Sequence, residues 1–182
     1  MGILGRKPKI DRLVATIHDA VDPHARAEAF QALGESGDPR AFDELVNLLN
    51  EAWLVGPAAV ALAAQNKKAA IRPLAQAMTL QEDRALEEAL ASLSRSFRQE
   101  VLDAVLPLLH GRVTLESGKT VISSLSAIRC LGMIGGADLV PHLEPFLSDP
   151  SITTSSAAAG ALDKIGGAEA EAALRRAGLG RL

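Results

Sequence analysis

The chain has few of the residues that build aromatic cores and cross-links. It contains no Tyr, one Trp, four Phe and a single Cys among 182 residues. A lone Cys forms no internal disulfide, which argues against a disulfide-stapled secreted domain and favours a reducing compartment. The core must therefore be built from Leu, Ala, Val and Ile, which suits closely packed helices better than a large sandwich.

Charge of one sign and long apolar runs are also missing. The 19 basic and 22 acidic residues give a formal charge of −3, so the chain lacks the positive field that drives non-specific nucleic-acid binding. No window reaches the ~20 apolar residues of a membrane span. Residues 1–9 carry charge without the apolar stretch of a signal peptide. We predict a cytoplasmic protein that binds neither nucleic acid nor membrane, with residues 1–9 as a flexible basic N-terminus.

What the chain does have is a repeated spacing of apolar residues. Five anchor residues end alanine-rich runs about 30 residues apart, namely Leu33, Leu62, Leu93, Leu131 and Leu162. A second apolar residue follows each anchor after a polar turn, at Leu45, Leu74, Val105, Leu143 and Leu174. Further apolar residues stand three or four positions from these, which is the stripe of an amphipathic helix. Each unit therefore holds two helices, and the period indicates a stacked helical repeat.

The predicted fold is all-α: an α-α superhelix, a right-handed helical solenoid of about five helix pairs with an N-terminal capping helix. We expect one domain over residues 10–182, with first helices on the convex layer and second helices on the concave layer. The expected units are about 23–50, 51–80, 83–110, 118–148 and 149–178. The longest step between anchors lies between Leu93 and Leu131, so we place an insertion at 110–119.

The turns inside the units have their own residue types. Four residues after the anchors stand Gly37, Asn66, Phe97, Gly135 and Gly166. Glycine and asparagine accept the left-handed conformation that ends a helix. Phe97 does not, so the third turn should be built differently.

Proline marks the helix starts. An aspartate precedes proline at Asp22, Asp38 and Asp149, which predicts a capping carboxylate followed by proline at the first helical position. Pro57 falls inside the expected first helix of the second unit, which Trp53 should open, and we expect this proline to kink it.

Residues 32–41 (ALGESGDPRA), followed by Leu45, resemble the consensus of HEAT-type repeats. More narrowly they are similar to the short HEAT-like repeat of phycobilisome lyases. Residues 131–137 and 162–168 echo the same pattern, and the resemblance covers roughly residues 23–178. It implies a helical repeat fold and three kinds of activity. Most members are protein-binding scaffolds, some attach or detach bilins, and others on related repeats are DNA glycosylases or metal-dependent hydroxylases.

Two of these activities require residues that the chain does not supply in the needed pattern. A repeat hydroxylase needs His-Glu pairs in several units, and none of His18, His24, His110 and His142 is directly followed by Glu. A helical-repeat glycosylase needs a second-helix surface rich in Lys, Arg and aromatic residues, and the outward positions here are mixed. We therefore predict no enzyme activity, no metal site and no cofactor.

The outward positions of the second helices are the candidate partner-binding residues on the concave face. They are Asp43, Glu44, Asn47, Arg72, Gln76, Asp103 and His142. We predict a non-catalytic scaffold or adaptor, monomeric or weakly homodimeric, that holds a protein or peptide there. The alternative is a bilin lyase, or a lyase subunit or chaperone acting on a chromophore protein, in which the acidic members contact pyrrole nitrogens.

Three further features leave alternatives open. A candidate anion patch lies at matching turns of adjacent units, formed by Lys67, Lys68, Arg95 and Arg98, although ordinary solvated turn residues are the preferred interpretation. Cys130 stands among apolar neighbours and is expected to be an inert core residue. Trp53 is either partly buried packing or an exposed contact residue.

Overall fold

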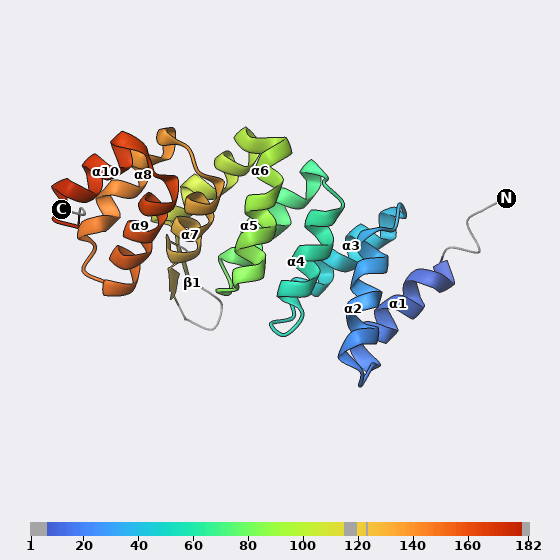
Figure 1. The fold of residues 1–182 in the computed structure, drawn as a ribbon. Coiled ribbons are helices and arrows are strands. Elements are labelled where there is room, and N and C mark those ends of the chain that lie inside the picture. Colours follow the sequence, from blue (N-terminus) through green and yellow to red (C-terminus); the bar gives the residue numbers. More distant parts are fainter. Residues whose placement is uncertain (1–6, 115–119, 123, 180–182) are drawn as a thin grey trace.

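The structure is a computed structural model that describes residues 7–114, 120–122 and 124–179. Its helices follow one another in a row, so that the two ends of the chain lie at opposite ends of the array (Figure 1). This is the predicted all-α superhelix of stacked helix pairs. None of the helices in the described part is long and apolar enough to cross a lipid bilayer.

The helix bounds follow the predicted pairing. Helix α1 (Lys7–Asp19) packs on the first pair, as the expected cap, and begins three residues before the expected position 10. The first helices of the units are α2 (Pro23–Gly34), α4 (Val55–Ala64), the N-terminal part of α6 (Arg84–Val105), α7 (Ser124–Ile134) and α9 (Ile152–Ile165). The second helices are α3 (Pro39–Leu48), α5 (Ile71–Met78), the C-terminal part of α6, α8 (Val140–Leu143) and α10 (Gly167–Arg176).

Short 3-10 segments extend several of the second helices. They are η1 (Lys68–Ala70), η2 (Leu106–His110), η3 (Ala137–Leu139) and η4 (Glu144–Ser148). Prolines at the start of η2 and within α8 and η4 remove backbone donors, which favours short helical pieces over one long helix.

The anchor residues form the centre of one continuous hydrophobic core. All five anchors are buried, as are four of their partners in the second helices, from Leu45 to Leu143. Leu174 of α10 is only half-buried. The core is aliphatic throughout most of its length, as the composition requires.

First helices pack directly on one another, and in two places only glycine fits. A Cβ built on Gly34 of α2 would lie 2.9 Å from the Ala61 carbonyl oxygen of α4. A Cβ on Gly132 of α7 would lie 2.6 Å from the Ala161 Cβ of α9. These distances are below van der Waals contact, so glycine lets the helix backbones approach closely.

The turn predictions are confirmed at four of five positions. Asn66, Gly135 and Gly166 have φ values of 47°, 71° and 66°. Phe97 has φ −137° and ψ 49° and kinks α6, so the third unit has a bend where the others have a turn. The prediction is wrong for Gly37, which has no positive φ. Helix α2 ends through Glu35 in a right-handed conformation instead.

The predicted caps at Asp22 and Asp38 are confirmed, since each carboxylate accepts a backbone N–H two residues on, at 2.9 and 3.0 Å. The prediction for Asp149 is wrong by two residues. Ser151 caps α9 by accepting the Thr154 N–H, and Asp149 accepts the Ser151 N–H at 2.8 Å.

The predicted kink at Pro57 is also wrong. Helix α4 begins at Val55, later than expected, so Pro57 falls in its first turn. Backbone N–H groups there have no intrahelical acceptor, and proline therefore costs nothing at this position.

The insertion forms a short β-hairpin. Strand β1 (Arg112–Thr114) pairs antiparallel with β2 (Thr120–Ile122), with Val113 opposite Val121. The hairpin projects from the helical array (Figure 1). It overlaps the predicted insertion at 110–119 and extends beyond it to residue 122. Residues 115–119, and residues 1–6 of the predicted N-terminal tail, lie outside the described residues.

Ion pairs join neighbouring units along the array. They link Arg40 to Asp11, Lys68 to Glu100, Arg98 to Asp138 and Arg176 to Glu144. All are solvent-accessible, and exposed pairs of this kind contribute at most about 1 kcal/mol each. The stack therefore depends on buried helix contacts, and the ion pairs adjust its register.

The close helix contact at Gly132 generates a stability prediction. We expect Gly132→Ala to lower the free energy of unfolding by about 1–3 kcal/mol, because its methyl group overlaps Ala161. Gly160→Ala on α9 is the matched control, since a Cβ there meets nothing within 4 Å. This control should stabilise the chain by about 0.5–1 kcal/mol through helix propensity. Urea denaturation measures both, and equal effects of the two variants would contradict the close-contact interpretation.

Candidate functional site

The predicted partner-binding residues all lie on second helices. Six of the seven are exposed, and Glu44 is half-buried. Asp43 and Asn47 lie one turn apart on α3, and Arg72 and Gln76 lie one turn apart on α5. Their side chains are therefore held on rigid elements.

A groove runs between α3 and α5 on this surface, and we call it the second-helix groove. Its volume is about 330 Å³, and it is lined by Val46, Leu49, Asn50, Pro73, Gln76, Ala77, Thr79 and Leu80. Leu80 is 43% exposed at its edge. The Gln81 side chain donates a hydrogen bond to the Leu49 carbonyl oxygen at 3.0 Å. This bond links the segments that follow α3 and α5, on the two sides of the groove.

The predicted contact residues do not form one site. Gln76 lines the second-helix groove, and Asp43 stands one turn before Val46 on the same face of α3. Asp103 lies in the next unit and accepts a hydrogen bond from the Gln99 amide at 2.8 Å. His142 lies on α8, a further unit along. The predicted contact residues are thus spread over four units, and of these Gln76 lines the second-helix groove.

Sequence reasoning missed the apolar lining of this groove. Pro73 lies in the first turn of α5, and Leu80 lies past the repeated stripe in the connection to the next unit. An exposed leucine after the end of a helical stripe was the available signal.

The predicted anion patch is partly neutralised. The Lys68 ammonium pairs with Glu100 at 2.8 Å, and Arg98 pairs with Asp138 at 2.8 Å while donating to the Gly135 carbonyl oxygen. Lys67 donates to the Gln65 side chain and lies 5.7 Å from the Phe42 ring. Arg95 is exposed and makes one long contact, to the Ser92 carbonyl oxygen. Two of the four cations therefore have carboxylate partners, and this patch has the weaker support as a binding surface.

Trp53 is exposed and also packs against neighbouring side chains, so it fits both of the predicted alternatives. It is 56% exposed and lies in the turn before α4 rather than at a helix start. The Arg26 guanidinium lies 5.1 Å from its ring centroid, and the His18 ring meets it edge-on at 6.3 Å. Arg26 also donates to two carbonyl oxygens at the end of α1. The exposed indole thus covers the junction between the cap and the array.

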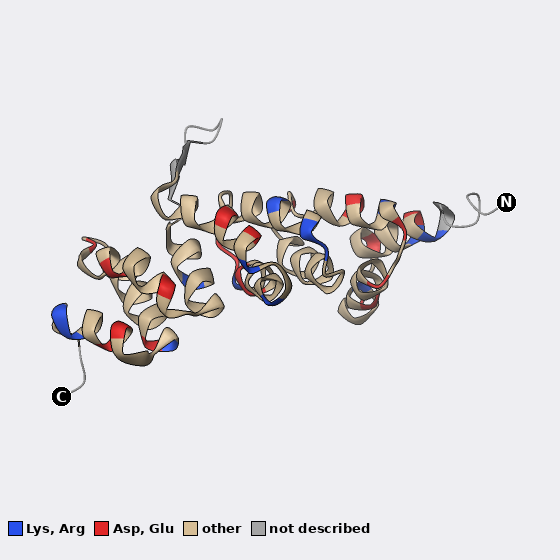
Figure 2. Cartoon of the chain, turned by 90° about the horizontal axis from the view of Figure 1, so that it is seen from above, with Lys and Arg blue, Asp and Glu red and all other residues tan. Residues whose placement is uncertain are grey.

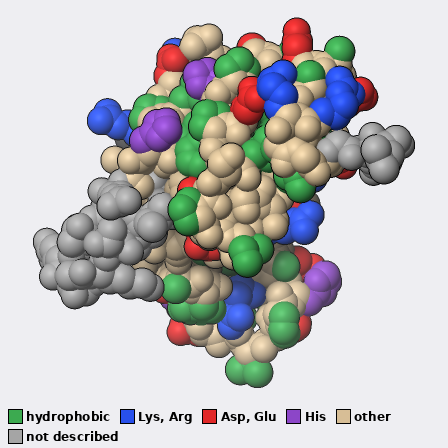
Figure 3. Space-filling model, turned by 90° about the vertical axis from the view of Figure 1, so that its left-hand side faces the viewer, with side chains coloured by type: hydrophobic (Ala, Val, Ile, Leu, Met, Phe, Trp, Pro, Cys, Tyr) green, Lys and Arg blue, Asp and Glu red, His purple; other side chains and the backbone are tan. Residues whose placement is uncertain are grey.

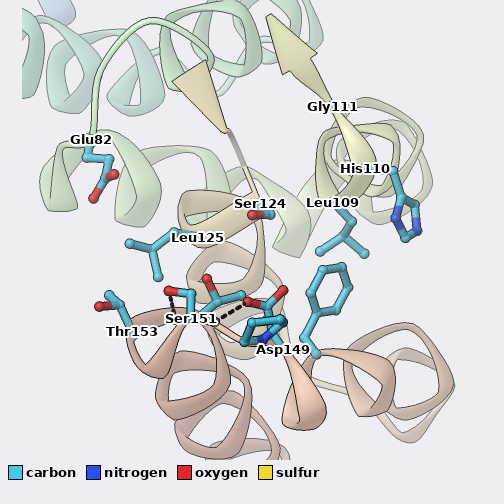
Figure 4. Close-up of a pocket in the computed structure, with 12 residues that line it drawn as sticks. Glu82, Leu109, His110, Gly111, Ser124, Leu125, Asp149, Ser151 and Thr153 are labelled. Carbon is cyan, nitrogen blue, oxygen red and sulfur yellow. Dashed lines mark hydrogen bonds between the residues drawn. The ribbon is translucent and has the colours of Figure 1, made fainter. Parts of the chain in front are cut away.

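A further hollow lies at the base of the hairpin, where η2 meets the N-terminal ends of α7 and α9 (Figure 4). Its volume is about 730 Å³. His110 stacks on Phe146 with ring centroids 5.7 Å apart. Asp149 and Ser151 face the hollow but hold backbone N–H groups of α9. Because Asp149 and Ser151 are engaged in capping, these two side chains are less available to a ligand.

The charged residues are interspersed along the array rather than gathered in one region (Figure 2). The end at which α10 lies shows small groups of hydrophobic side chains between polar and charged ones (Figure 3). Within residues 7–114, 120–122 and 124–179, no group of three His, Cys, Asp or Glu side chains has the geometry to hold a metal ion.

Two titratable side chains of the first helices are buried. Cys130 of α7 is buried, as predicted, and burial together with the charge of Glu87 raises the pKa of its thiol to about 12. Glu87 of α6 is only 2% exposed. Burial raises the pKa of its carboxyl above the ordinary 4.5, while Ser126 and Arg129 offset part of the shift.

Sequence reasoning also missed Glu87. It stands six residues before its anchor, where the other units carry Ala27, Gly56, Leu125 and Ser156. A single charged residue at a repeat position that is otherwise uncharged was the signal that could have found it.

Comparisons with known proteins support the repeat. Residues 25–51 match the family model described as PBS lyase HEAT-like repeat, which corresponds to α2, α3 and the turns around them. No curated protein matches the chain. Among solved structures, one engineered protein is 23% identical, with 93% of this chain and 85% of that chain covered and a TM-score of 0.42. A second engineered protein is 22% identical, with 94% and 51% covered and a TM-score of 0.41. Neither TM-score is high enough to bear on function.

The burial of Cys130 generates a prediction on reactivity. We expect its thiol to resist alkylation in the folded chain at pH 8, because the thiolate is the reacting form and burial suppresses it. Labelling with a maleimide should become complete only above the urea midpoint. Fast labelling of folded chain, under conditions where circular dichroism shows intact helix, would contradict the buried placement.

The burial of Glu87 generates a prediction on pH. Its pKa is raised in the folded state, so the folded chain holds this proton more tightly than the unfolded chain. The stabilisation is present below about pH 4.5 and is lost as pH rises through the folded-state pKa. Glu87→Gln should therefore raise the melting temperature at pH 7, and the gain should shrink as pH falls toward 4.5. Thermal melts of both proteins across this range test it, and a gain independent of pH would contradict it.

Proposed function

We propose that the chain is a non-catalytic scaffold that binds a segment of a partner protein in the second-helix groove. One observation carries the proposal: a hollow with a partly apolar lining lies open between α3 and α5, with Leu80 exposed at its edge. Exposed apolar hollows rimmed by polar residues are typical of protein interaction sites.

The residues around the groove indicate which segment fits. Val46, Pro73 and Leu80 offer an apolar surface for one or two aliphatic or aromatic side chains. Asp43 and the half-buried Glu44 stand on the α3 side, so basic residues flanking the apolar anchor are favoured there. Asn50 and Gln76 offer amide groups for the hydrogen bonds of an extended backbone. Because helices fix these side chains, little conformational entropy is lost on binding.

The bilin-lyase alternative has less support. The family match covers one unit, in which the matched positions are core and turn residues. The single thiol of the chain lies in the core, so no cysteine faces the grooves described above. We therefore place the scaffold function first.

A selection of peptides from a random display library tests the proposal. Wild-type protein should enrich peptides with an apolar anchor flanked by basic residues. Leu80→Glu should weaken the selected peptides at least about tenfold, because it puts a charge at the edge of the apolar groove. Asp43→Lys should weaken the basic-flanked peptides and spare those without basic residues.

Val60→Glu is the matched control, since Val60 is a similarly exposed aliphatic residue on the first helix α4. It should leave peptide affinity unchanged. Equal binding to wild type and Leu80→Glu would show that the second-helix groove is not the binding surface.

A further inference from the structure

A second groove lies on the other helix layer and crosses three units. It consists of two adjoining hollows of about 340 and about 350 Å³, which share Arg129 of α7 and Lys164 of α9. Arg84 and Glu87 of α6 line one end. We call this surface the first-helix groove. It shares no lining residue with the second-helix groove.

Three cations from three successive first helices line this groove. Lys164 is exposed and pairs with no carboxylate among the described residues. The Arg129 guanidinium lies 3.7 Å from both Glu82 and Glu87, which is too long for a hydrogen bond. Arg84 is held by Glu88 at 2.7 Å. Arg129 and Lys164 thus keep donors for a further anionic group.

A buried carboxyl group also lines the first-helix groove. Glu87 lines the groove and is 2% exposed, and its Oε1 atom makes no hydrogen bond within the described part of the chain. The neighbouring Ser126 hydroxyl makes no well-aligned hydrogen bond there either, although it lies near enough to the Glu87 carboxyl to lower its pKa. A buried polar atom without a partner costs about 1–3 kcal/mol. Such atoms call for an explanation, and a ligand that hydrogen-bonds to Glu87 supplies one.

The floor of the groove is made of small residues. Ala157, Gly160 and Ala161 share one face of α9 and line the hollow. A Cβ built on Gly160 meets nothing within 4 Å, so the space above it is open. Small side chains allow a peptide backbone to approach the helix closely.

We propose that the first-helix groove binds an acidic peptide segment of a partner protein, with a carboxylate of that segment lying between Arg129 and Lys164. The cations that line the groove outnumber its one carboxyl, which excludes a basic segment on charge grounds. The groove spans three helices and has a small-residue floor, which fits an extended peptide better than an isolated anion. In its protonated form Glu87 donates a hydrogen bond to the bound carboxylate, and this satisfies the buried group.

Fluorescence anisotropy with a labelled peptide of alternating glutamate and alanine tests the proposal. Wild-type protein should bind this peptide and should not bind the matching lysine–alanine peptide. Lys164→Glu should weaken binding at least about tenfold, whereas Lys164→Arg should keep it within about twofold. Gly160→Phe should abolish binding by filling the groove. Glu87→Gln should retain binding, because its amide still donates a hydrogen bond.

Arg95→Glu is the control for a general loss of positive charge, since Arg95 is exposed and lies outside the groove. It should leave affinity unchanged, and circular dichroism should show every variant folded. Leu80→Glu should also bind the acidic peptide with wild-type affinity. This result distinguishes an error in the proposal for the second-helix groove from an error in the proposal for the first-helix groove.

Three results would overturn the proposal. Equal weakening by Arg95→Glu and Lys164→Glu would indicate non-specific charge attraction. Displacement of the peptide by millimolar inorganic phosphate would indicate a simple anion site. Unchanged binding to Gly160→Phe would show that the peptide lies elsewhere.

Discussion

The rest of the structure depends on the close contact between consecutive first helices. Gly132 on Ala161 and Gly34 on Ala61 bring backbones nearer than any side chain at the glycine positions would permit. A chain with so few aromatic residues gains its core through many such short contacts, because each Leu or Ala buries little area alone. The spacing of the helices then sets what lies between them, and both grooves are consequences of that spacing.

Stacking also explains why charges from distant parts of the sequence meet. The units stack in register, so nearby positions of neighbouring units lie side by side. The inter-unit pair of Lys68 with Glu100 and the pair of Arg98 with Asp138 arise this way at the turns. On the first helices, Arg84, Arg129 and Lys164 occupy different positions relative to their anchors, and the stacking nevertheless places all three along one groove. Repetition thus builds an extended surface from residues that have no local motif.

Features at repeated positions of the chain can be predicted from the sequence, whereas features at unrepeated positions are harder to predict. The anchors, the burial of Cys130, the turn at Asn66 and the irregular turn at Phe97 follow from spacing and residue type alone. Helix starts are harder to predict from the sequence. Ser151 and Asp149 are both good capping residues, and tertiary packing determines which of them caps α9. The grooves were not predictable, since periodicity assigns a residue to a face but does not give the gap between two faces. Glu87 lies between these cases, visible as an exception in the repeat but without an assigned role.

Glu87 is also where stability and binding conflict. A carboxyl group buried between α6 and α7 lowers the stability of the stack at neutral pH, since its charge is poorly solvated. An apolar residue of similar size would pack there without that cost. Among the described residues that line the first-helix groove, the same carboxyl is the one acidic group beside three cations. Departures from the best packing choice are expected at functional sites, and in this chain the departure coincides with the groove that crosses three units.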